Sequence, residues 1–454
     1  MGGRYKAYLE YKDSGEDWLG DIPVDWKALQ IKHLSTVKRG ASPRPIDDPK
    51  YFDNEGEYVW TRIADVTASD VYLLDAPQRL SKLGSSLSVK LIPGALFLSI
   101  AGTVGKPCIT AINACIHDGF VYFPELKIPS KFLYYVFAGE QAYKGLGKFG
   151  TQLNLNTDTV GGIKIGLAEN DVLEKIVQFL DYETAKIDTL IEKQQQLIQL
   201  LKEKRQAVIS HAVTKGLNTN AKMRDSGVEW LGEVPEHWIV RRLKHVCDLQ
   251  SGIAKGRDLT GRSSISVPML RVANVQDGYL DLSEVHEIAI EPAQLERYSL
   301  KSGDVLMNEG GDNDKLGRGA VWQEQISPCI HQNHVFAIRP TSIEPEWLDL
   351  VTRASYAKFH FYLVAKQSTN LASISATNIK ETPLIIPPEE ERARIMEYVS
   401  SQLKLLSLAE EKSGLQVRLL QERRTALISA AVTGKIDVRD WVPPRSDHRS
   451  EEAA

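Results

Sequence analysis

The stretch DSGEDWLGDIPVDW, residues Asp13–Trp26, occurs a second time as DSGVEWLGEVPEHW, residues Asp225–Trp238, 212 residues further along the chain. Both copies keep the two Trp residues, the Leu-Gly pair and the Pro, while the acidic positions vary. Tryptophan buries a large apolar area, and no catalytic signature accompanies it here. We therefore interpret the stretch as a packing anchor, and its duplication as the sign of a repeated structural unit.

The repeat continues beyond the anchor. Arg62–Val66 (RIADV) matches Arg271–Val275 (RVANV) at an offset of 209 residues. Leu200–Thr214 (LLKEKRQAVISHAVT) matches Leu419–Thr433 (LLQERRTALISAAVT) at an offset of 219. The ends of the two copies agree best, and the drifting offset places small insertions in the middle segments. The chain is therefore two copies of one unit.

Each copy combines a globular segment with a long helix. Short β-prone runs broken by Gly, Pro and Asp indicate a mixed α/β domain with an antiparallel-rich sheet. A helix of about 45 residues, roughly 65 Å long, follows in each copy and ends before Gly216 or Gly434. The expected segments are residues 1–168 (first domain), 169–216 (first helix), 217–387 (second domain), 388–436 (second helix) and 437–454 (disordered tail).

Connectivity predicts the direction of the helices. The first helix leads from the first domain to the second, so a second helix packed along it must run back. The expected fold class is α+β: two tandem mixed α/β domains separated by two long antiparallel coiled-coil helices, related by a pseudo-twofold repeat. Each anchor would then receive the carboxyl end of the other copy's helix, and the Trp side chains would supply apolar area there.

A heptad pattern supports helix pairing. Polar residues occupy the same layer of the seam in both helices, Gln194 in the first and Ser413 in the second. They are either exposures tolerated near the middle of the helices or a polar layer that fixes the register. The remaining predicted seam residues are Leu173, Leu180, Ile187, Leu201 and Val208, with Ile176, Leu190 and Leu197, in the first helix, and Val399, Leu406, Leu420 and Leu427 in the second.

Composition limits the class of protein. The chain has 454 residues, 43% hydrophobic and 25% charged, as an ordinary soluble protein with several domains would have. No apolar run approaches the roughly 20 residues that cross a bilayer, and no secretory signal is recognisable. Four unclustered cysteines favour a reducing cytoplasm. A net charge of −4 argues against coating DNA by charge alone, but local basic patches remain compatible with it.

No catalytic motif stands out. The segment Gly102–Pro107 (GTVGKP) lacks the upstream Gly and the Ser/Thr after the Lys that a phosphate loop needs. The duplicated Cys-Ile-His, at residues 115–117 and 329–331, has no partner pair spaced for a zinc site, so we expect core-facing strand residues there. The sequence therefore favours a binding protein over an enzyme.

Gly-rich loops with basic and amide side chains recur at matching places in both copies. Plain turn chemistry explains any one of them, but their matched placement favours a ligand surface. Arg, Lys, Asn, Gln and Thr are the residues that read base edges and hold phosphates. The loops are Lys38–Pro45, Ala101–Pro107 and Gly147–Asn156 in the first copy, and Ser251–Arg257, Asn308–Gly319 and Lys366–Ser373 in the second.

In this order and duplication, the motifs resemble those of the specificity subunits of type I restriction-modification enzymes. The resemblance rests on YKDSGEDWLGDIPVDW with its second copy, the GDVLMNEGG loop, CIHQNHVFAIRP, and the helix text IPPEEERARI with LLQERRTALISAAVTGKID. It covers nearly the whole chain.

The resemblance implies two target recognition domains, each reading one half of a split double-stranded DNA sequence, with the helices setting the spacing. It implies a subunit without catalysis of its own that binds two methyltransferase subunits along the helices, and then restriction (motor-nuclease) subunits. S-adenosylmethionine, ATP and magnesium would belong to those partners. On physics alone, a coiled-coil scaffold that presents two non-DNA ligand-binding modules fits the same architecture.

The candidate DNA-binding residues follow from the loops and from the resemblance. In the first copy, LSIAGTVGK lacks the polar residues of MNEGG, which moves the prediction from Ile100 to Thr103 and Lys106. The full set is Arg44, Arg62, Thr103, Lys106, Thr151, Gln152 and Asn154 in the first copy, and Arg257, Arg271, Asn308, Asn313, Lys315, Arg318, Thr369 and Asn370 in the second.

Overall fold

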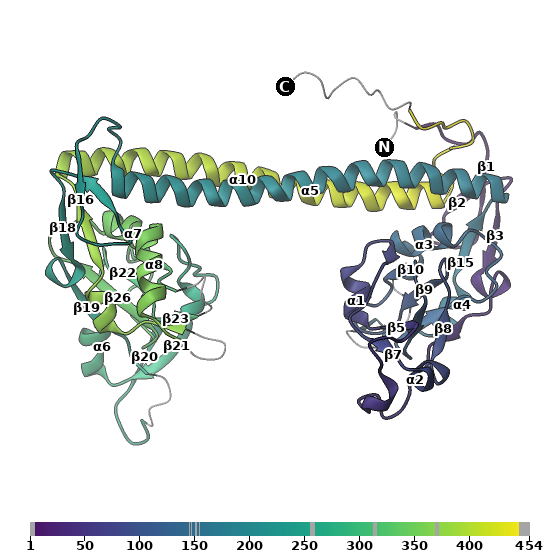
Figure 1. The fold of residues 1–454 in the computed structure, drawn as a ribbon, viewed down its shortest axis with the longest axis horizontal. Helices are drawn as coiled ribbons and strands as arrows, with labels where there is room; N and C mark the ends of the chain where they lie inside the picture. The colour runs from purple at the N-terminus through teal and green to yellow at the C-terminus, as the bar shows by residue number, and fades with distance from the viewer. Residues whose placement is uncertain are drawn as a thin grey trace. The chain divides into compact units, whose positions relative to one another are not determined.

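A computed structural model describes residues 5–144, 146, 148–149, 152–153, 155–254, 259–311, 316–367 and 372–444 (Figure 1). The chain forms two compact units, Met1–Gln194 with Leu415–Ala454, and Gln195–Gly414. The two long helices, α5 (Asn170–Lys215) and α10 (Glu389–Val432), each contribute one part to either unit. The first unit is therefore completed by the carboxyl-terminal part of the chain.

The first unit contains two main sheets, with strand orders β4-β12-β9-β10-β6 and β7-β5-β11-β8. Most neighbours are antiparallel, and β10–β6 and β11–β5 are parallel. The strands are β1 (Tyr11–Asp13), β2 (Asp21–Pro23), β3 (Lys27–Gln30), β4 (Lys38–Arg39), β5 (Tyr58–Thr61), β6 (Tyr72–Leu73), β7 (Arg79–Leu80), β8 (Val89–Leu91), β9 (Leu96–Ser99), β10 (Pro107–Thr110), β11 (Ala114–Ile116), β12 (Phe120–Tyr122), β13 (Lys148–Phe149), β14 (Gln152–Leu153) and β15 (Lys164–Leu167). The short helices are α1 (Ile63–Ala68), α2 (Lys82–Ser86), α3 (Ser130–Ala138) and α4 (Thr157–Gly162).

The second unit repeats this plan. Its main sheet, β19-β26-β22-β24, has the order of β4-β12-β9-β10, and β21-β20-β25 has the order of β7-β5-β11. The strands are β16 (Met223–Asp225), β17 (Glu233–Pro235), β18 (Ile239–Arg242), β19 (Cys247–Ser251), β20 (Ile265–Leu270), β21 (His286–Ile290), β22 (Val305–Asn308), β23 (Gly310–Gly311), β24 (Gly319–Val321), β25 (Ile330–His331), β26 (Val335–Pro340), β27 (Lys366–Gln367), β28 (Ala372–Ser373) and β29 (Pro383–Ile386). The short helices are α6 (Pro292–Tyr298), α7 (Pro345–Arg353), α8 (Ser355–Val364) and α9 (Ala376–Lys380).

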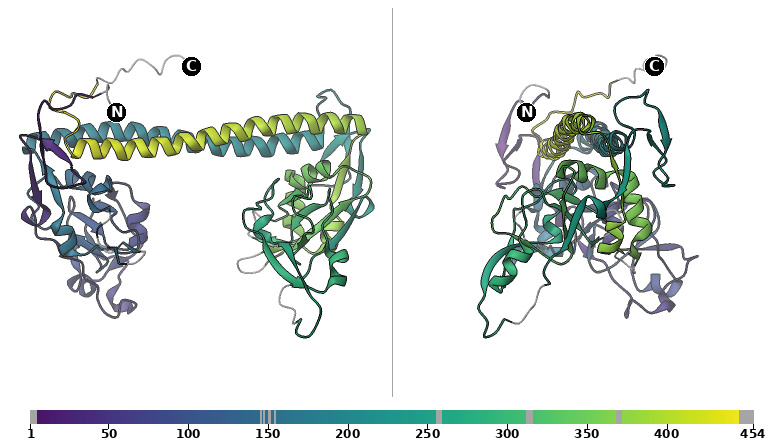
Figure 2. Two further views of the ribbon diagram at one scale, coloured as in Figure 1. Left: turned by 180° about the vertical axis from the view of Figure 1, so that it is seen from behind. Right: turned by 90° about the vertical axis from the view of Figure 1, so that its left-hand side faces the viewer.

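Within each unit the parts of α5 and α10 pack in opposite directions (Figure 2). In the first unit, Asp188 accepts a hydrogen bond of 2.8 Å from Arg424, and Lys175 donates to the carbonyl of Arg439. In the second unit, Arg205 donates to Glu410 at 3.0 Å, and Gly216 lies beside Glu391. Numbering rises along one helix as it falls along the other, as the sequence predicted.

The anchor role of the duplicated stretch is confirmed. Trp26 is buried in one core with Ile428 and Val432 of α10, and Trp238 in the other with Ile209 and Val213 of α5. The helix ends are held alike: Lys435 donates to the carbonyl of Asp21, and Lys215 donates to that of Glu233. Gly434 and Gly216 follow the helices with φ of 70° and 73°, a conformation that glycine adopts without strain. Each anchor thus receives the end of the other copy's helix.

Part of the predicted seam is wrong. Leu190 and Leu197 are 47% and 41% exposed, while their neighbours Ile191 and Ile198 are half-buried. The inward positions alternate by four and three residues, because a helix turns once every 3.6 residues, so a column placed one residue early faces solvent. Ser413 is buried and Gln194 is half-buried. These two polar side chains are therefore not simply exposed surface residues.

The expected tail is also wrong in part. Val438 is fully buried, and Trp441 packs edge-on against Phe179 at 5.4 Å. Asp437 donates its backbone N–H to the carbonyl of Lys6. These apolar contacts order residues 437–441 against α5, whereas residues 445–454 lie outside the described residues. No helix in the described part of the chain combines the length and apolarity needed to cross a membrane.

Candidate nucleic-acid interface

A capped turn presents one arginine in each unit. In the first, Arg62 follows β5 and precedes α1, and its backbone N–H donates to Asp65 at 2.8 Å. In the second, Arg271 follows β20, and its N–H donates to Asn274 at 2.9 Å. The equivalent carboxylate and amide fix the backbone and leave the arginine side chain to project from the turn. The matched RIADV and RVANV sequences therefore encode the same capped turn after the strand.

The environments of the two arginines differ. The Arg62 side chain is 46% exposed and approaches Asp65 at 3.5 Å. The Arg271 side chain is 23% exposed, and its Nε has no hydrogen-bond partner among the described residues. Its terminal nitrogen lies 3.8 Å from Glu284. The Arg271 Nε is buried, but both side chains are partly exposed, so their terminal nitrogens could donate to a ligand.

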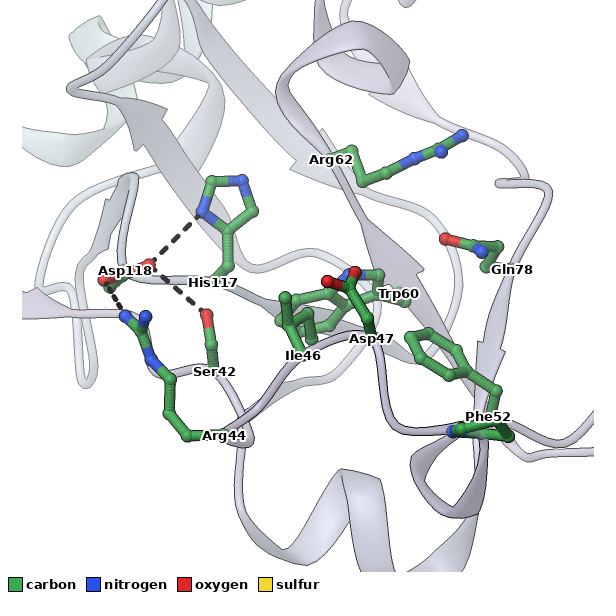
Figure 3. A pocket seen from close by; sticks show the side chains of 11 residues that line it. Ser42, Arg44, Ile46, Asp47, Phe52, Trp60, Arg62, Gln78, His117 and Asp118 are labelled. Carbon is green, nitrogen blue, oxygen red and sulfur yellow. Dashed lines mark hydrogen bonds and ion pairs between the residues drawn. The ribbon is translucent and has the colours of Figure 1, made fainter.

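Arg62 lines a cleft of about 780 Å³ in the first unit (Figure 3). Two predicted residues, Arg44 and Arg62, lie on different sides of it, with Trp60 and Ile46 between them. The cleft therefore combines two cationic side chains, an aromatic and apolar wall, and both hydrogen-bond donors and acceptors. The lining residues are Ser42, Arg44, Ile46, Asp47, Pro49, Phe52, Trp60, Arg62, Gln78, His117 and Asp118.

Asp118 joins two sides of this cleft. Its carboxylate accepts hydrogen bonds from Arg44 at 2.9 Å and from Ser42 at 3.3 Å (Figure 3). His117 Nδ1 accepts the backbone N–H of Gly119 at 2.8 Å, and burial lowers the pKa of the imidazole despite the nearby Asp118. The ring is therefore neutral at pH 7, with its proton on Nε2. Sequence reasoning missed Asp118 because it follows a Cys-Ile-His strand assigned to the core.

Thr103 and Lys106 contact the other end of α1. Thr103 Oγ1 lies 2.8 Å from Thr67 Oγ1, and the exposed Thr103 is available to a ligand. Lys106 Nζ donates to the carbonyls of Thr67 and Ser69, at 3.0 Å and 2.7 Å. The Lys106 ammonium thus satisfies carbonyl groups at the carboxyl end of α1. These bonds give Lys106 a role in supporting the loop, and its DNA contact stays a prediction.

Asn308 was predicted to contact DNA, but its burial corrects this to a supporting role. It is 3% exposed, and its amide donates to the carbonyls of Val272 and Val275 at 3.3 Å and 2.9 Å. These bonds hold the 3-10 turn Val272–Asn274 that Arg271 caps. Asn308 therefore supports the turn that carries Arg271. Arg318 is half-buried between β23 and β24, and its backbone carbonyl accepts the N–H of Asn308.

The remaining predicted residues are not tested by the structure. Gln152 lies in β14, which pairs with β13, but its side chain is outside the description. The others lie outside the described residues: Thr151, Asn154, Arg257, Asn313, Lys315, Thr369 and Asn370.

The Cys-Ile-His segments are core residues, as predicted, with the exception of His117, which follows β11, is half-buried and lines the cleft. Cys115 and Ile116 are fully buried, and burial raises the pKa of the Cys115 thiol to about 11. His331 is 1% exposed and hydrogen-bonds the carbonyl of Val335. No group of metal-ligating side chains gathers among the residues that the structure describes.

Comparisons with known proteins agree with this plan. Residues 235–414 match the type I restriction modification DNA specificity domain. The specificity subunit of the type I restriction enzyme EcoKI from Escherichia coli K12 is 21% identical over 92% of this chain and 90% of its own length. The MjaIX specificity subunit of Methanocaldococcus jannaschii is 20% identical over 96% and 99%. The putative MjaX specificity subunit of that organism is 26% identical, over 37% of this chain and 40% of its own.

A solved chain from work on complex assembly and conformational transition of the type I R-M system has the same fold. It superposes with a TM-score of 0.67 at 15% identity and covers 91% of this chain and 99% of that chain. The family match spans most of the second globular domain and the first part of α10, up to residue 414, and the sequence relatives extend the likeness to both copies. Over nearly its whole length, the chain is thus similar to the specificity subunits of type I restriction-modification enzymes.

Proposed function

We propose that this chain is the DNA-sequence-recognition subunit of a type I restriction-modification complex, in which each globular domain reads one half of a bipartite site. The observation that carries the proposal is the duplicated turn, in which Asp65 and Asn274 fix Arg62 and Arg271 at equivalent positions. Arginine is the commonest reader of guanine and also binds phosphates. Two related arginine turns with different neighbouring side chains suit the reading of two different half-sites.

The cleft in the first domain supports a direct role in reading. Arg44 is 73% exposed and Arg62 46%, so both cations are accessible to a polyanion. Gln78 and Asp118 add amide and carboxylate groups of the kinds that discriminate base edges. This combination offers phosphate contacts for affinity and base contacts for specificity, in a protein whose net charge is −4.

The long helices would set the half-site spacing and bind two methyltransferase subunits. Support comes from large apolar side chains left exposed on them, since exposed apolar patches of this kind mark protein interfaces. In the first unit these are Leu190, Leu415 and Leu419, and in the second Leu197, Leu200, Leu405 and Leu408.

In this proposal the chain carries out no reaction itself. S-adenosylmethionine would bind the methyltransferase subunits, and ATP and magnesium the restriction subunits that join them. The contribution of this chain is to select the sequence and to hold the methyltransferases over it.

Sequencing of methylated bases in cells that express the chain with its methyltransferase subunit tests the proposal. The expected result is one bipartite motif with a constant spacer. Gel-shift titrations of the purified chain, with and without that subunit, should show DNA binding that falls steeply with salt. Absence of sequence preference in both assays would overturn the proposal in favour of a scaffold with two non-DNA binding modules.

A further inference from the structure

Strand pairing identifies equivalent positions in the two domains. Asp118 follows His117 after β11, and Gln332 follows His331 after β25. A Cβ at Gly40 would lie 2.1 Å from the His117 carbonyl oxygen, and one at Gly252 would lie 2.1 Å from that of His331. Both glycines let a loop cross the turn at the same close distance. Residues 118 and 332 therefore occupy structurally equivalent positions in the two domains and carry different side chains.

The contacts of Asp118 suit recognition better than stability. Its side chain is 42% exposed, and its Arg44 partner is 73% exposed. Ion pairs this exposed contribute little to folding. A carboxylate can accept about four hydrogen bonds, so acceptor capacity remains beyond the bonds from Arg44 and Ser42. Arg44 also offsets the negative charge that would otherwise repel DNA phosphates.

We propose that Asp118 and Gln332 are matched specificity-determining residues, one for each half-site. Asp118 accepts a hydrogen bond from the exocyclic amino group of a cytosine or adenine. Gln332, which can both donate and accept, pairs with an adenine edge. The proposal rests on the proposed function and extends it, because the shared arginine turn would locate the DNA while this position distinguishes the sequences.

Exposed residues beside the middle strand of each sheet, β5 and β20, also differ between the domains. The carbonyl of Gln78 accepts the N–H of Trp60 at 2.8 Å, and His286 pairs with Met269 at the equivalent place. Trp60 and Met269 each precede the capping arginine by two residues. Gln78 is exposed in the first domain, and His286 in the second. The arrangement of strands is thus the same in both domains, while the exposed side chains on it differ, as two readers of different sequences require.

The test uses the complete chain with its methyltransferase subunit. D118N keeps the size of the side chain, D118Q installs the residue of the other domain, and Q332D makes the reciprocal change. D75N is the matched control, because Asp75 is 75% exposed and lies outside the cleft lining. Bound sequences are selected from randomised DNA, and methylated motifs are sequenced in cells.

We expect D118N and D118Q to change base preference at one position of the first half-site by roughly 5- to 150-fold. Q332D should change only the second half-site, and D75N neither. Unchanged preferences, or equal loss of binding to all sequences in both D118N and D118Q, would overturn the inference. Failure of the wild-type complex to select any bipartite sequence would instead overturn the proposed function, and this inference with it.

Discussion

Asp118 accepts a hydrogen bond of 2.9 Å from the guanidinium group of Arg44, across a separation of 74 residues in the chain. The pair joins the turn after β11 to the loop after β4, and both residues line the same cleft. It shows how a candidate reading surface is assembled from loops that the sheet brings together.

Replacing the turn arginines should weaken DNA binding without unfolding the domains. R62A and R271A keep the capping bond, because the backbone N–H donates it. A lost base contact costs about 1–3 kcal/mol and relaxes one position, while a lost phosphate contact weakens all sequences alike. Competition binding distinguishes these results. R62K is the informative companion, since lysine keeps the charge but loses the bidentate fork. Wild-type binding by both alanine variants would contradict the assignment.

The two domains should be exchangeable. Replacing residues 41–168 by the corresponding segment of a related protein should change one half-site and leave the other intact, because the anchor and both helices are kept. Sequencing of methylated sites reports both halves at once. A hybrid in which both half-sites change would show that the domains are coupled.

Lengthening both helices should lengthen the spacer. Inserting about four residues near Gln194 and about four near Ser413 extends each helix by roughly 6 Å, or about one or two base pairs. The half-sites should stay the same, because no reading loop is altered. Methylation sequencing again decides, with circular dichroism to confirm helix content. An active protein with an unchanged spacer would mean that the helices do not set the distance.

Truncating an anchor tryptophan should destabilise the unit that contains it. Trp26 and Trp238 are each 1% exposed, so W26A and W238A should each cost about 3–5 kcal/mol in free energy of unfolding. Trp230 supplies the control: it is 38% exposed, so W230A should cost much less. Urea denaturation measures all three. Equal costs for W238A and W230A would remove the anchor role from Trp238.

Asp349 should make stability depend on pH. Burial raises its pKa from 3.8 to about 6, even though Arg353 opposes the shift. Between these values the unfolded state has lost the proton that the folded state keeps, so stability falls as pH rises and levels off above about 6. D349N removes this dependence. Relative to wild type, it should gain about 1.4 kcal/mol between pH 5 and pH 7.5 in urea denaturation. A pH-independent difference would show that Asp349 titrates normally.

The sequence alone determined the repeat, the ends of both long helices and the anchor role of Trp26 and Trp238. These features depend on local signals, such as helix-stopping glycines, and on similarity between the copies, which needs no knowledge of contacts. The seam column at Leu190 and Leu197 failed for a related reason: a one-residue shift rotates a side chain by about 100°, and only packing reveals which neighbour is covered.

Only the tertiary structure decided which polar residues line a cleft and which support it. Asn308 and Lys106 have the residue types of DNA contacts, yet their hydrogen bonds satisfy carbonyl groups inside the domains. Asp118 belongs to no recognisable motif. Its position in the cleft depends on the packing of the turn after β11 against the loop after β4, which carries Arg44. The exposure of a polar group depends on distant strands that cover or uncover it, and spacing along the chain does not encode that.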